Sequence, residues 1–365
     1  MERLIRRAGL EEIHRKVLAG ERLSFEEGVR LYGTPELTAV GYLANLVRER
    51  RHGDRAYWVR NQHINYTNIC NKDCSFCSFY AKKGGPAPYT LSVDQIREKV
   101  RQYREIPITE IHMVGGINPR LPYQYYLDIV RAIKEERPQA HLKAYTMIEL
   151  EEIHRVSGKS LEDVLEDLKA AGVESMPGGG AEILSARLHQ ELFKRKLDFE
   201  GWLRMARAAH RAGLRSNATM LYGHIESAEE RVEHLLRLRE LQDETGGFVT
   251  FIPLAFDPKG TELSHLPNTT GVEDLRAIAV ARLMLDNFEH IKAFWVMITP
   301  PVAQTALWYG ADDLDGTIQE YEITHVGTES NRQVLTHGQL LGLIEEAGRV
   351  PVERDTLYNV VEMAA

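Results

Sequence analysis

The sequence contains three cysteines, and all of them fall in one short segment. Cys70, Cys74 and Cys77 have the spacing C-x3-C-x2-C. A structural zinc site takes four protein ligands, and an ordinary iron–sulfur cubane takes four thiolates. Three thiolates on one loop therefore predict a centre for a soft metal that keeps one metal position open for another ligand.

The cysteine segment is also compatible with three simpler roles. Free cysteines usually scatter through protein cores, so three structural thiols in one segment are an unusual arrangement. A disulfide with a spare thiol fits a secreted protein, whereas the N-terminal segment lacks the apolar core of a signal peptide. A zinc ion could take His63 or His112 as its fourth ligand, but the sequence has no second cysteine pair of the kind zinc sites usually use.

A strand–helix alternation begins near residue 62 and runs through most of the chain. Strands are predicted at 63–69, 108–114, 141–146, 173–176, 215–221, 248–254, 291–296 and 321–326. Helices are predicted at 92–104, 121–136, 160–171, 199–212, 227–243, 272–287, 301–309 and 338–347. Short apolar strands separated by amphipathic helices are typical of a buried parallel sheet, and roughly eight such units close into a barrel.

The sequence therefore predicts an α/β protein with a (β/α)8 TIM-type barrel at 61–365 that ends in a helical segment. A doubly wound open sheet is the alternative. Residues 1–60 are predicted as a helical N-terminal extension, in which Ser24 begins a helix with acidic residues in its first turn. In barrels of this kind the active site lies where the strands lead into the helices, and the cysteine segment follows the first predicted strand of the barrel.

Glycines and polar side chains mark the ends of other predicted strands. The pair Gly115-Gly116 follows an apolar strand and lets the backbone approach a ligand closely; a simple tight turn is the alternative. Polar side chains alternate along two strands, and an inward-facing polar group needs a partner such as a ligand or a buried water. The predicted substrate contacts are His63, Asn65, Thr67, Asn217 and Thr219.

Tyr222 and His224 stand just beyond the strand at 215–221. Both could donate a proton or a hydrogen bond to a substrate at the barrel mouth, and both are predicted catalytic residues. A histidine in a structural role is the alternative for His224.

The composition excludes several functional classes. Of the 365 residues, 43% are hydrophobic and 27% are charged, as in ordinary globular proteins. A formal net charge of −8 argues against a nucleic-acid-binding surface, which would carry a basic face. Apolar runs are too short to span a bilayer. We therefore expect a cytoplasmic protein that binds neither nucleic acid nor membranes.

The cysteine spacing, with the aromatic Phe76 directly before the third cysteine, resembles the radical S-adenosylmethionine (SAM) superfamily. The resemblance implies that the cysteines hold three irons of a [4Fe-4S] cluster and that SAM chelates the fourth. It implies that Gly115-Gly116 binds the SAM amino group, although Ile117 replaces the acidic residue that usually follows the pair. Further implied or predicted SAM contacts are Phe76, Tyr80, Thr146, Glu182 and Arg187. For the last two, a helix-capping glutamate and a surface arginine are the alternatives.

Further segments narrow this resemblance to the radical SAM enzymes of the menaquinone (futalosine) pathway. These segments are 63–70, 176–184, 218–226, 309–317 and 348–355. The likeness is greatest to the enzymes that form 6-amino-6-deoxyfutalosine. It implies that the 5′-deoxyadenosyl radical adds to 3-[(1-carboxyvinyl)oxy]benzoate, with methionine and bicarbonate as the other products. Cyclic dehypoxanthine futalosine synthases and FO synthases share the cysteine loop, and they remain alternatives, as does a zinc or electron-transfer module.

The implied acceptor carries two carboxylates, so a cationic side chain should face it. Candidates by position are Lys143, His224 and His325. The resemblance also implies an electron donor such as flavodoxin or ferredoxin. The sequence leaves the oligomeric state open, a dimer included.

Overall fold

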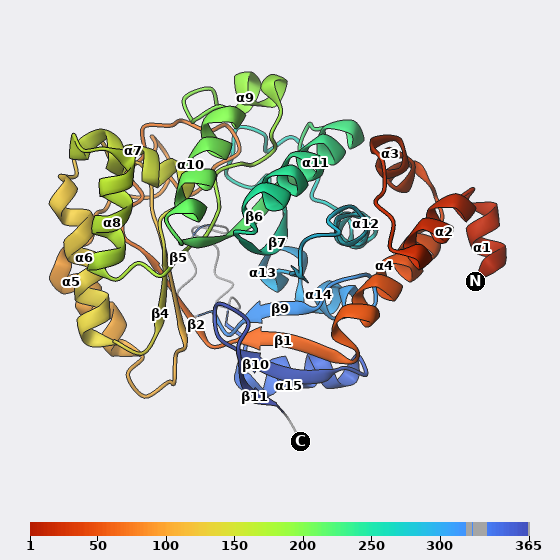
Figure 1. Ribbon diagram of the computed structural model, residues 1–365. Coiled ribbons are helices and arrows are strands. Elements are labelled where there is room, and N and C mark those ends of the chain that lie inside the picture. Colours follow the sequence, from red (N-terminus) through yellow and green to blue (C-terminus); the bar gives the residue numbers. More distant parts are fainter. Residues whose placement is uncertain (319–322, 324–333, 364–365) are drawn as a thin grey trace.

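A parallel sheet of seven strands forms the centre of the molecule, in a computed structural model that describes residues 1–318, 323 and 334–363 (Figure 1). Its strands follow one another in space in the same order as along the chain. They are β2 (Asn61–Asn65), β3 (Glu110–Val114), β4 (His141–Ala144), β5 (Ser175–Met176), β6 (Arg215–Tyr222), β7 (Phe248–Ala255) and β8 (His290–Ile291). This sequential parallel order is that of an α/β barrel and places all seven carboxyl ends at one mouth.

A second sheet closes the barrel between β8 and β2. It consists of β1 (Arg55–Val59), β9 (Asp313–Gly316), β10 (Val350–Arg354) and β11 (Val360–Met363), in the order β11-β10-β1-β9. A parallel bridge from Lys292 to Asp313 joins the end of β8 to β9, and β9 pairs in parallel with β1, which leads into β2. The parallel α/β barrel architecture is thus confirmed as a half-barrel of seven strands, with β9 beside β8. The strand predicted at 321–326 lies, apart from Ile323, outside the described residues.

The helices cover the outside of this barrel. Those near their predicted positions are α5 (Val93–Gln102), α6 (Tyr123–Glu136), α8 (Leu161–Ala171), α10 (Phe199–Arg211), α11 (Ala228–Thr245), α12 (Gly271–Met284), α14 (Pro300–Ala306) and α15 (His337–Glu346). Sequence analysis did not predict α7 (Met147–Ser157), α9 (Ala186–Leu192) or α13 (Trp295–Ile298). The last of these begins at Trp295, so the strand predicted at 291–296 is shorter than expected: β8 ends at Ile291, and α13 takes the last two predicted residues.

Four helices precede the barrel at the N-terminal end: α1 (Glu2–Arg7), α2 (Glu11–Ala19), α3 (Phe25–Gly33) and α4 (Leu37–His52). Ser24 begins α3 as predicted, because it forms a capping box with Glu27. Helices α3 and α4 pack against α11 and α12, on one flank of the barrel (Figure 1). Strand β1 lies within 1–60 but belongs to the second sheet, and β10 and β11 accompany α15 in the C-terminal segment. The division at residue 60 stays a prediction.

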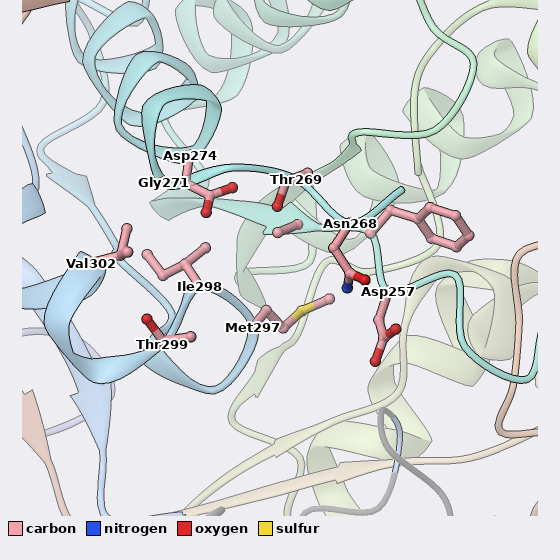
Figure 2. Close-up of a pocket in the computed structure, with 11 residues that line it drawn as sticks. Asp257, Asn268, Thr269, Gly271, Asp274, Met297, Ile298, Thr299 and Val302 are labelled. Atoms are coloured by element: carbon pink, nitrogen blue, oxygen red, sulfur yellow. The ribbon is translucent and has the colours of Figure 1, made fainter. Parts of the chain in front are cut away.

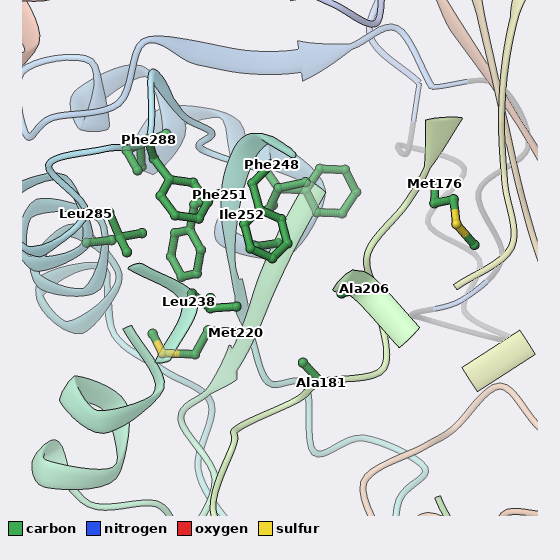
Figure 3. Close-up of a cluster of buried hydrophobic side chains, with 14 of the residues drawn as sticks. Met176, Ala181, Ala206, Met220, Leu238, Phe248, Phe251, Ile252, Leu285 and Phe288 are labelled. Carbon is green, nitrogen blue, oxygen red and sulfur yellow. The ribbon is translucent and has the colours of Figure 1, made fainter. Parts of the chain in front are cut away.

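An aromatic cluster fixes β6 and β7 against α11 and α12 (Figure 3). The rings of Phe248 and Phe288 stack at 5.3 Å between centroids, and Phe251 meets Phe288 edge-on at 6.3 Å. Met220 of β6 and Leu238 of α11 are also buried in this cluster. Full burial of each such side chain stabilises the fold by about 1.5–3 kcal/mol. This packing holds two of the strands whose carboxyl ends reach the barrel mouth.

Candidate active site

A cavity of about 270 Å³ opens where the carboxyl ends of the barrel strands meet. The loop after β2 contributes Cys70, Lys72, Cys74, Phe76 and Cys77, together with Tyr80. The turns after β3, β4 and β5 contribute Gly115, Gly116, Thr146, Gly179, Gly180 and Glu182. Strands β6 and β7 and the segments after β7 and β8 contribute Thr219, Leu221, Leu254, Phe256, Asp257 and Met297. Every strand of the seven-stranded sheet therefore contributes to the cavity, either with a residue of its own or with the segment that follows it.

The cysteine loop is held in place by backbone hydrogen bonds to three neighbouring segments. The Asn71 amide donates to the Ile117 carbonyl at 3.0 Å, and the Ser75 amide donates to the Leu192 carbonyl at 2.9 Å. The Ser75 carbonyl accepts from the Glu262 amide at 3.0 Å. The loop is thus fixed by the turn after β3, by α9 and by the segment after β7, and its cysteines line the cavity.

The backbone of Gly116 packs directly against the start of this loop. A Cβ atom at Gly116 would lie 2.5 Å from the Ile69 carbonyl oxygen and 3.1 Å from the Cys70 Cβ. Only glycine lets these two backbone segments approach so closely. The glycine pair therefore positions the first cysteine as well as lining the cavity.

Burial favours the protonated form of two of the cysteine thiols. Burial raises the pKa of Cys74 to about 12, although the nearby Lys196 ammonium opposes the shift. Burial also raises the pKa of Cys77. Because a metal binds the thiolate, assembly of a metal centre on this loop must release protons.

Lys196 lies beside the cysteines and is paired with Glu182. Its ammonium forms an ion pair with the Glu182 carboxylate and lies 5.0 Å from the centroid of the Phe76 ring. Burial lowers the pKa of Lys196, but the charge of Cys74 in its thiolate form and the Glu182 carboxylate more than offset this effect and hold the pKa above its ordinary value, so the ammonium becomes most stable when Cys74 is ionised. Sequence analysis did not identify Lys196, because nothing in its local sequence connects it to the cysteine loop.

Glu149 supports the glycine turn from behind. Its buried carboxylate accepts hydrogen bonds from the Gly115 amide at 2.9 Å, the Tyr66 hydroxyl at 2.8 Å and the Thr146 hydroxyl at 2.8 Å. Burial raises the pKa of Glu149 to about 7. Sequence analysis missed this residue, but the Thr146-x-x-Glu149 capping box at the start of α7 could have revealed it.

The cavity brings together most of the residues predicted to contact a cofactor. They are Cys70, Cys74, Cys77, Phe76, Tyr80, Gly115, Gly116, Thr146 and Glu182. Among the predicted substrate contacts, Thr219 also lines it. Their individual roles remain predictions.

Arg187 lies away from the cavity. Its guanidinium pairs with Glu230 at 2.6 Å and with Glu191 at 3.3 Å, and 46% of its side chain is exposed. This position corresponds to the surface arginine that the sequence left as the alternative.

Tyr222 and His224 are buried behind the cavity wall. The Tyr222 hydroxyl donates to Asp274 at 2.8 Å. The His224 ring contacts the Leu221 carbonyl at 3.2 Å and the Glu226 carboxylate at 2.9 Å. Neither side chain lines the cavity, so a catalytic role for either would have to act through these partners.

The remaining predicted substrate contacts lie deeper in the protein. His63 stacks on His112 with 4.6 Å between ring centroids, and the Asn65 amide donates to the Val114 carbonyl at 3.1 Å. The Thr67 hydroxyl donates to the Tyr89 carbonyl at 2.8 Å, and Asn217 is buried on β6. None of these side chains lines the cavity.

Two further residues are predicted to bind a carboxylate of the substrate. One of them forms an ion pair away from the cavity, and the other lies outside the described residues. Lys143 forms a buried ion pair with Glu110 at 2.9 Å, away from the cavity. His325 lies outside the described residues.

A second cavity of about 210 Å³ adjoins the first and shares Phe256, Asp257 and Met297 with it. Figure 2 shows Thr269 and Asp274 on its wall, near the start of α12. Burial raises the pKa of Asp274. This cavity enlarges the space available beside the cysteine loop.

The arrangement of possible ligands favours a cluster over a single zinc ion. Three thiolates on one zinc ion lie only about 3.8 Å apart, given zinc–sulfur bonds of about 2.3 Å. Among the residues that the structure describes, the three cysteine sulfur atoms do not all lie within 4.8 Å of one another, whereas ligand atoms of His52, His290 and Asp312 do. The cysteine sulfurs are therefore spaced more widely than the ligands of one zinc ion. His63 and His112, the candidate fourth zinc ligands, stack on each other away from the cavity.

A parallel α/β barrel that carries three cysteines of this spacing at the carboxyl ends of its strands defines a protein of the radical SAM type. The Radical SAM superfamily model matches residues 64–238, and the CofH/MqnC C-terminal region model matches residues 245–365. Methylornithine synthase has a similar fold, with a TM-score of 0.74 and 17% identity over 93% of this chain and 96% of that chain. The hydrogenase maturase HydG from Carboxydothermus hydrogenoformans has a TM-score of 0.73 and 18% identity, over 95% and 80% of the two chains.

Curated relatives extend the match to nearly the whole chain. An aminodeoxyfutalosine synthase from Thermus thermophilus is 47% identical over 98% of this chain and 98% of its own length. One from Streptomyces coelicolor is 42% identical, over 97% and 95%. A cyclic dehypoxanthine futalosine synthase from Halalkalibacterium halodurans is 37% identical, over 96% and 95%.

The chain belongs to the radical SAM superfamily and, within it, to the family of these futalosine-pathway synthases. As a member it is an enzyme that uses a [4Fe-4S] cluster and SAM and acts on a small molecule. Within the described ranges, none of the helices combines the length and apolar character needed to cross a bilayer.

Proposed function

We propose that this protein is an aminodeoxyfutalosine synthase of menaquinone biosynthesis. It would join the 5′-deoxyadenosyl group of SAM to 3-[(1-carboxyvinyl)oxy]benzoate and, with one water consumed and one proton released, form 6-amino-6-deoxyfutalosine, methionine and bicarbonate. The observation that carries the proposal is the 47% and 42% identity to two such synthases across nearly the whole chain. The cysteine cavity supports it with the residues that this chemistry needs.

The residues present fit the cluster and its co-substrate. Cys70, Cys74 and Cys77 would hold the cluster, and the described part of the cavity wall offers no fourth cysteine and no histidine. When bound, the cluster and SAM supply the carbon-centred radical that attacks the acceptor. The glycine pair and Glu182 would hold SAM, and they lie on the same wall as the cysteine loop.

The chain's own contribution is binding, orientation and exclusion of water. Leu221, Leu254, Phe256 and Met297 line the cavity with apolar side chains. They would keep the acceptor's vinyl carbon near the adenosyl group in a dry space. Holding two reactants in a reactive geometry replaces a bimolecular encounter and is the main source of acceleration in such a site.

The test is anaerobic incubation of the reduced, cluster-loaded protein with SAM and the enolpyruvyl benzoate, followed by mass spectrometry. The proposal predicts a product that contains both substrates, 6-amino-6-deoxyfutalosine. Accumulation of free 5′-deoxyadenosine in its place would contradict it and would favour the chemistry of a related synthase.

The proposed function also includes an electron donor and a reducing compartment. A small reductase partner such as flavodoxin or ferredoxin would deliver the electron. A reducing cytoplasm suits the enzyme, because the thiols must be free to bind iron. The oligomeric state, a dimer included, is open.

A further inference from the structure

The charged side chains on the wall of the cysteine cavity are few. Among the described residues, its cationic side chains are Lys72 and Lys196, and its carboxylates are Glu182 and Asp257. Lys196 is already neutralised, because its ammonium is in contact with Glu182 and both side chains are nearly buried, at 12% and 13% exposure. Lys72 is therefore the cation on this wall that has no close partner on the same wall.

The ion-pair partner of Lys72 lies outside the cavity. The Lys72 ammonium is 3.5 Å from a carboxylate oxygen of Glu151 on α7. Glu151 does not line the cavity, and 30% of its side chain is exposed. An ion pair of this length with a carboxylate in contact with water contributes little, so it competes weakly with a ligand for the Lys72 charge.

The backbone on both sides of Lys72 is fixed. The Asn71 amide donates to the Ile117 carbonyl at 3.0 Å. Asp73 adopts a left-handed conformation, with φ of +48°, and forms an ion pair with Arg195. These contacts hold Lys72 at one place on the wall, between Cys70 and Cys74.

We propose that Lys72 binds a carboxylate group of a ligand in this cavity. The inference rests on the proposed function, in which SAM brings one carboxylate and the acceptor brings two. A carboxylate enclosed among apolar side chains requires a cation, and Lys72 supplies one. Because Lys72 lies between two cysteines of the loop, the methionine carboxylate of SAM is the nearest partner.

The test compares anaerobically reconstituted wild type with Lys72→Met, Lys72→Arg and the control Lys82→Met. Lys82 is a matched control because it also neighbours the cysteine loop, with its ammonium 3.4 Å from the Cys77 carbonyl, but does not line the cavity. Iron content and SAM affinity by equilibrium dialysis are measured without acceptor. We expect Lys72→Met to keep its iron and to bind SAM about tenfold or more weakly, with partial recovery in Lys72→Arg and no change in Lys82→Met.

Decarboxylated SAM identifies the group that Lys72 contacts. It should bind wild type and Lys72→Met with equal, weak affinity. If instead SAM affinity is unchanged and only the KM for the acceptor rises, Lys72 binds a carboxylate of the acceptor. This result also supports the proposal that Lys72 binds a ligand carboxylate.

Two results would overturn the inference. Lys72→Met that retains iron and handles both SAM and acceptor like wild type would show that no carboxylate needs this cation. Loss of iron in Lys72→Met would assign the residue to the integrity of the loop. Failure of the iron-loaded wild type to bind SAM is a different outcome, because it would contradict the proposed function itself.

Discussion

At the amino-terminal end of the barrel, buried charges contact opposite charges, whereas the cavity at the other end presents thiols and a lysine that a ligand can contact. Asp312 contacts Arg282 and lies 2.6 Å from His290, and Glu110 lies 2.9 Å from Lys143. At the carboxyl end, three free thiols and Lys72 line an open space. At the amino-terminal end the protein's own side chains neutralise one another, and at the carboxyl end the thiols and Lys72 are placed where ligands can bind them.

The C-terminal segment explains part of this difference. Arg354, at the end of β10, forms an ion pair with Asp313, and the Thr356 hydroxyl donates to Glu110 at 2.8 Å. The Tyr358 ring stacks on His290 with 3.5 Å between centroids. This segment packs against the amino-terminal ends of the strands and satisfies charges there. The same strands can then carry a cavity at their other ends.

The largest effect is expected at the cavity. Cys74→Ala should abolish cluster binding, reducing iron from about four per chain to background, and should eliminate detectable product. The melting temperature of the metal-free protein should change little, because the loop is held by backbone hydrogen bonds. Iron analysis and the product assay measure both outcomes, with Ser78→Ala, also on the cavity wall, as control. A Cys74→Ala protein that retains its cluster would contradict the assignment of the ligands.

Breaking a charge pair at the amino-terminal end of the barrel should lower stability and leave iron binding unchanged. Lys143→Met leaves Glu110 buried without its closest cationic partner and should lower the free energy of unfolding by about 3–5 kcal/mol. Arg237→Met, which removes an exposed pair with Glu233, should cost about 1 kcal/mol or less. Urea denaturation measures both.

The double variant Lys143→Met with Glu110→Met sharpens this contrast. It removes both charges, so it should recover part of the lost stability. Folded Lys143→Met protein should still bind iron like wild type. A loss of iron equal to that of Cys74→Ala would show that the two ends of the barrel are not independent.

A smaller change should couple the glycine turn to the cysteine loop. In Gly116→Ala, the new methyl group would meet the Ile69 carbonyl and push the loop away. We expect a loss of about 1–3 kcal/mol of stability, as in other overpacked sites, with reduced iron retention. Gly338→Ala is the control, because a Cβ there meets nothing within 4 Å. Equal iron retention in the two variants would contradict the positioning role of Gly116.

Buried histidines at the amino-terminal end of the barrel should also make the fold sensitive to acid. Burial lowers the pKa of His52 and of His63 to about 4, against about 6.5 in the unfolded chain. The unfolded state therefore binds more protons below pH 6.5, and stability that is present above that pH is lost as the pH falls towards 4. The slope should approach about 1.4 kcal/mol per pH unit for each histidine.

Denaturation curves between pH 7 and pH 4.5 measure this slope. His63→Gln should reduce it, because one buried group no longer titrates. A slope that is identical in wild type and His63→Gln would show that His63 is not held neutral by burial.

Sequence analysis could predict the features that local patterns encode. The cysteine spacing and the glycine pair at Gly115-Gly116 locate one wall of the cavity, and strand–helix alternation predicts the barrel that brings them together. Side-chain alternation puts Asn217 and Thr219 on one face of β6, and of these two Thr219 lines the cavity. The same rule places Tyr222 on the opposite face of β6, where it contacts Asp274 of α12.

Contacts between distant segments could not be predicted in this way. Lys196 reaches the cysteine loop from beyond α9, and Glu149 reaches the glycine turn from α7, a helix that sequence analysis did not predict. The ion pairs that occupy Lys143 and Arg187 also depend on tertiary packing. Sequence patterns therefore identify which residues lie near strand ends, but the barrel's packing decides which of them face the cavity.

The central claim is that the carboxyl end of the barrel leaves one metal position for SAM. Pulsed electron paramagnetic resonance of the reduced cluster, with SAM labelled with nitrogen-15 at its amino group, tests this claim most directly. We expect a nitrogen-15 coupling, because the amino group of SAM should be bound to iron. A spectrum that SAM leaves unchanged, with a nitrogen coupling from a histidine of the chain, would contradict it.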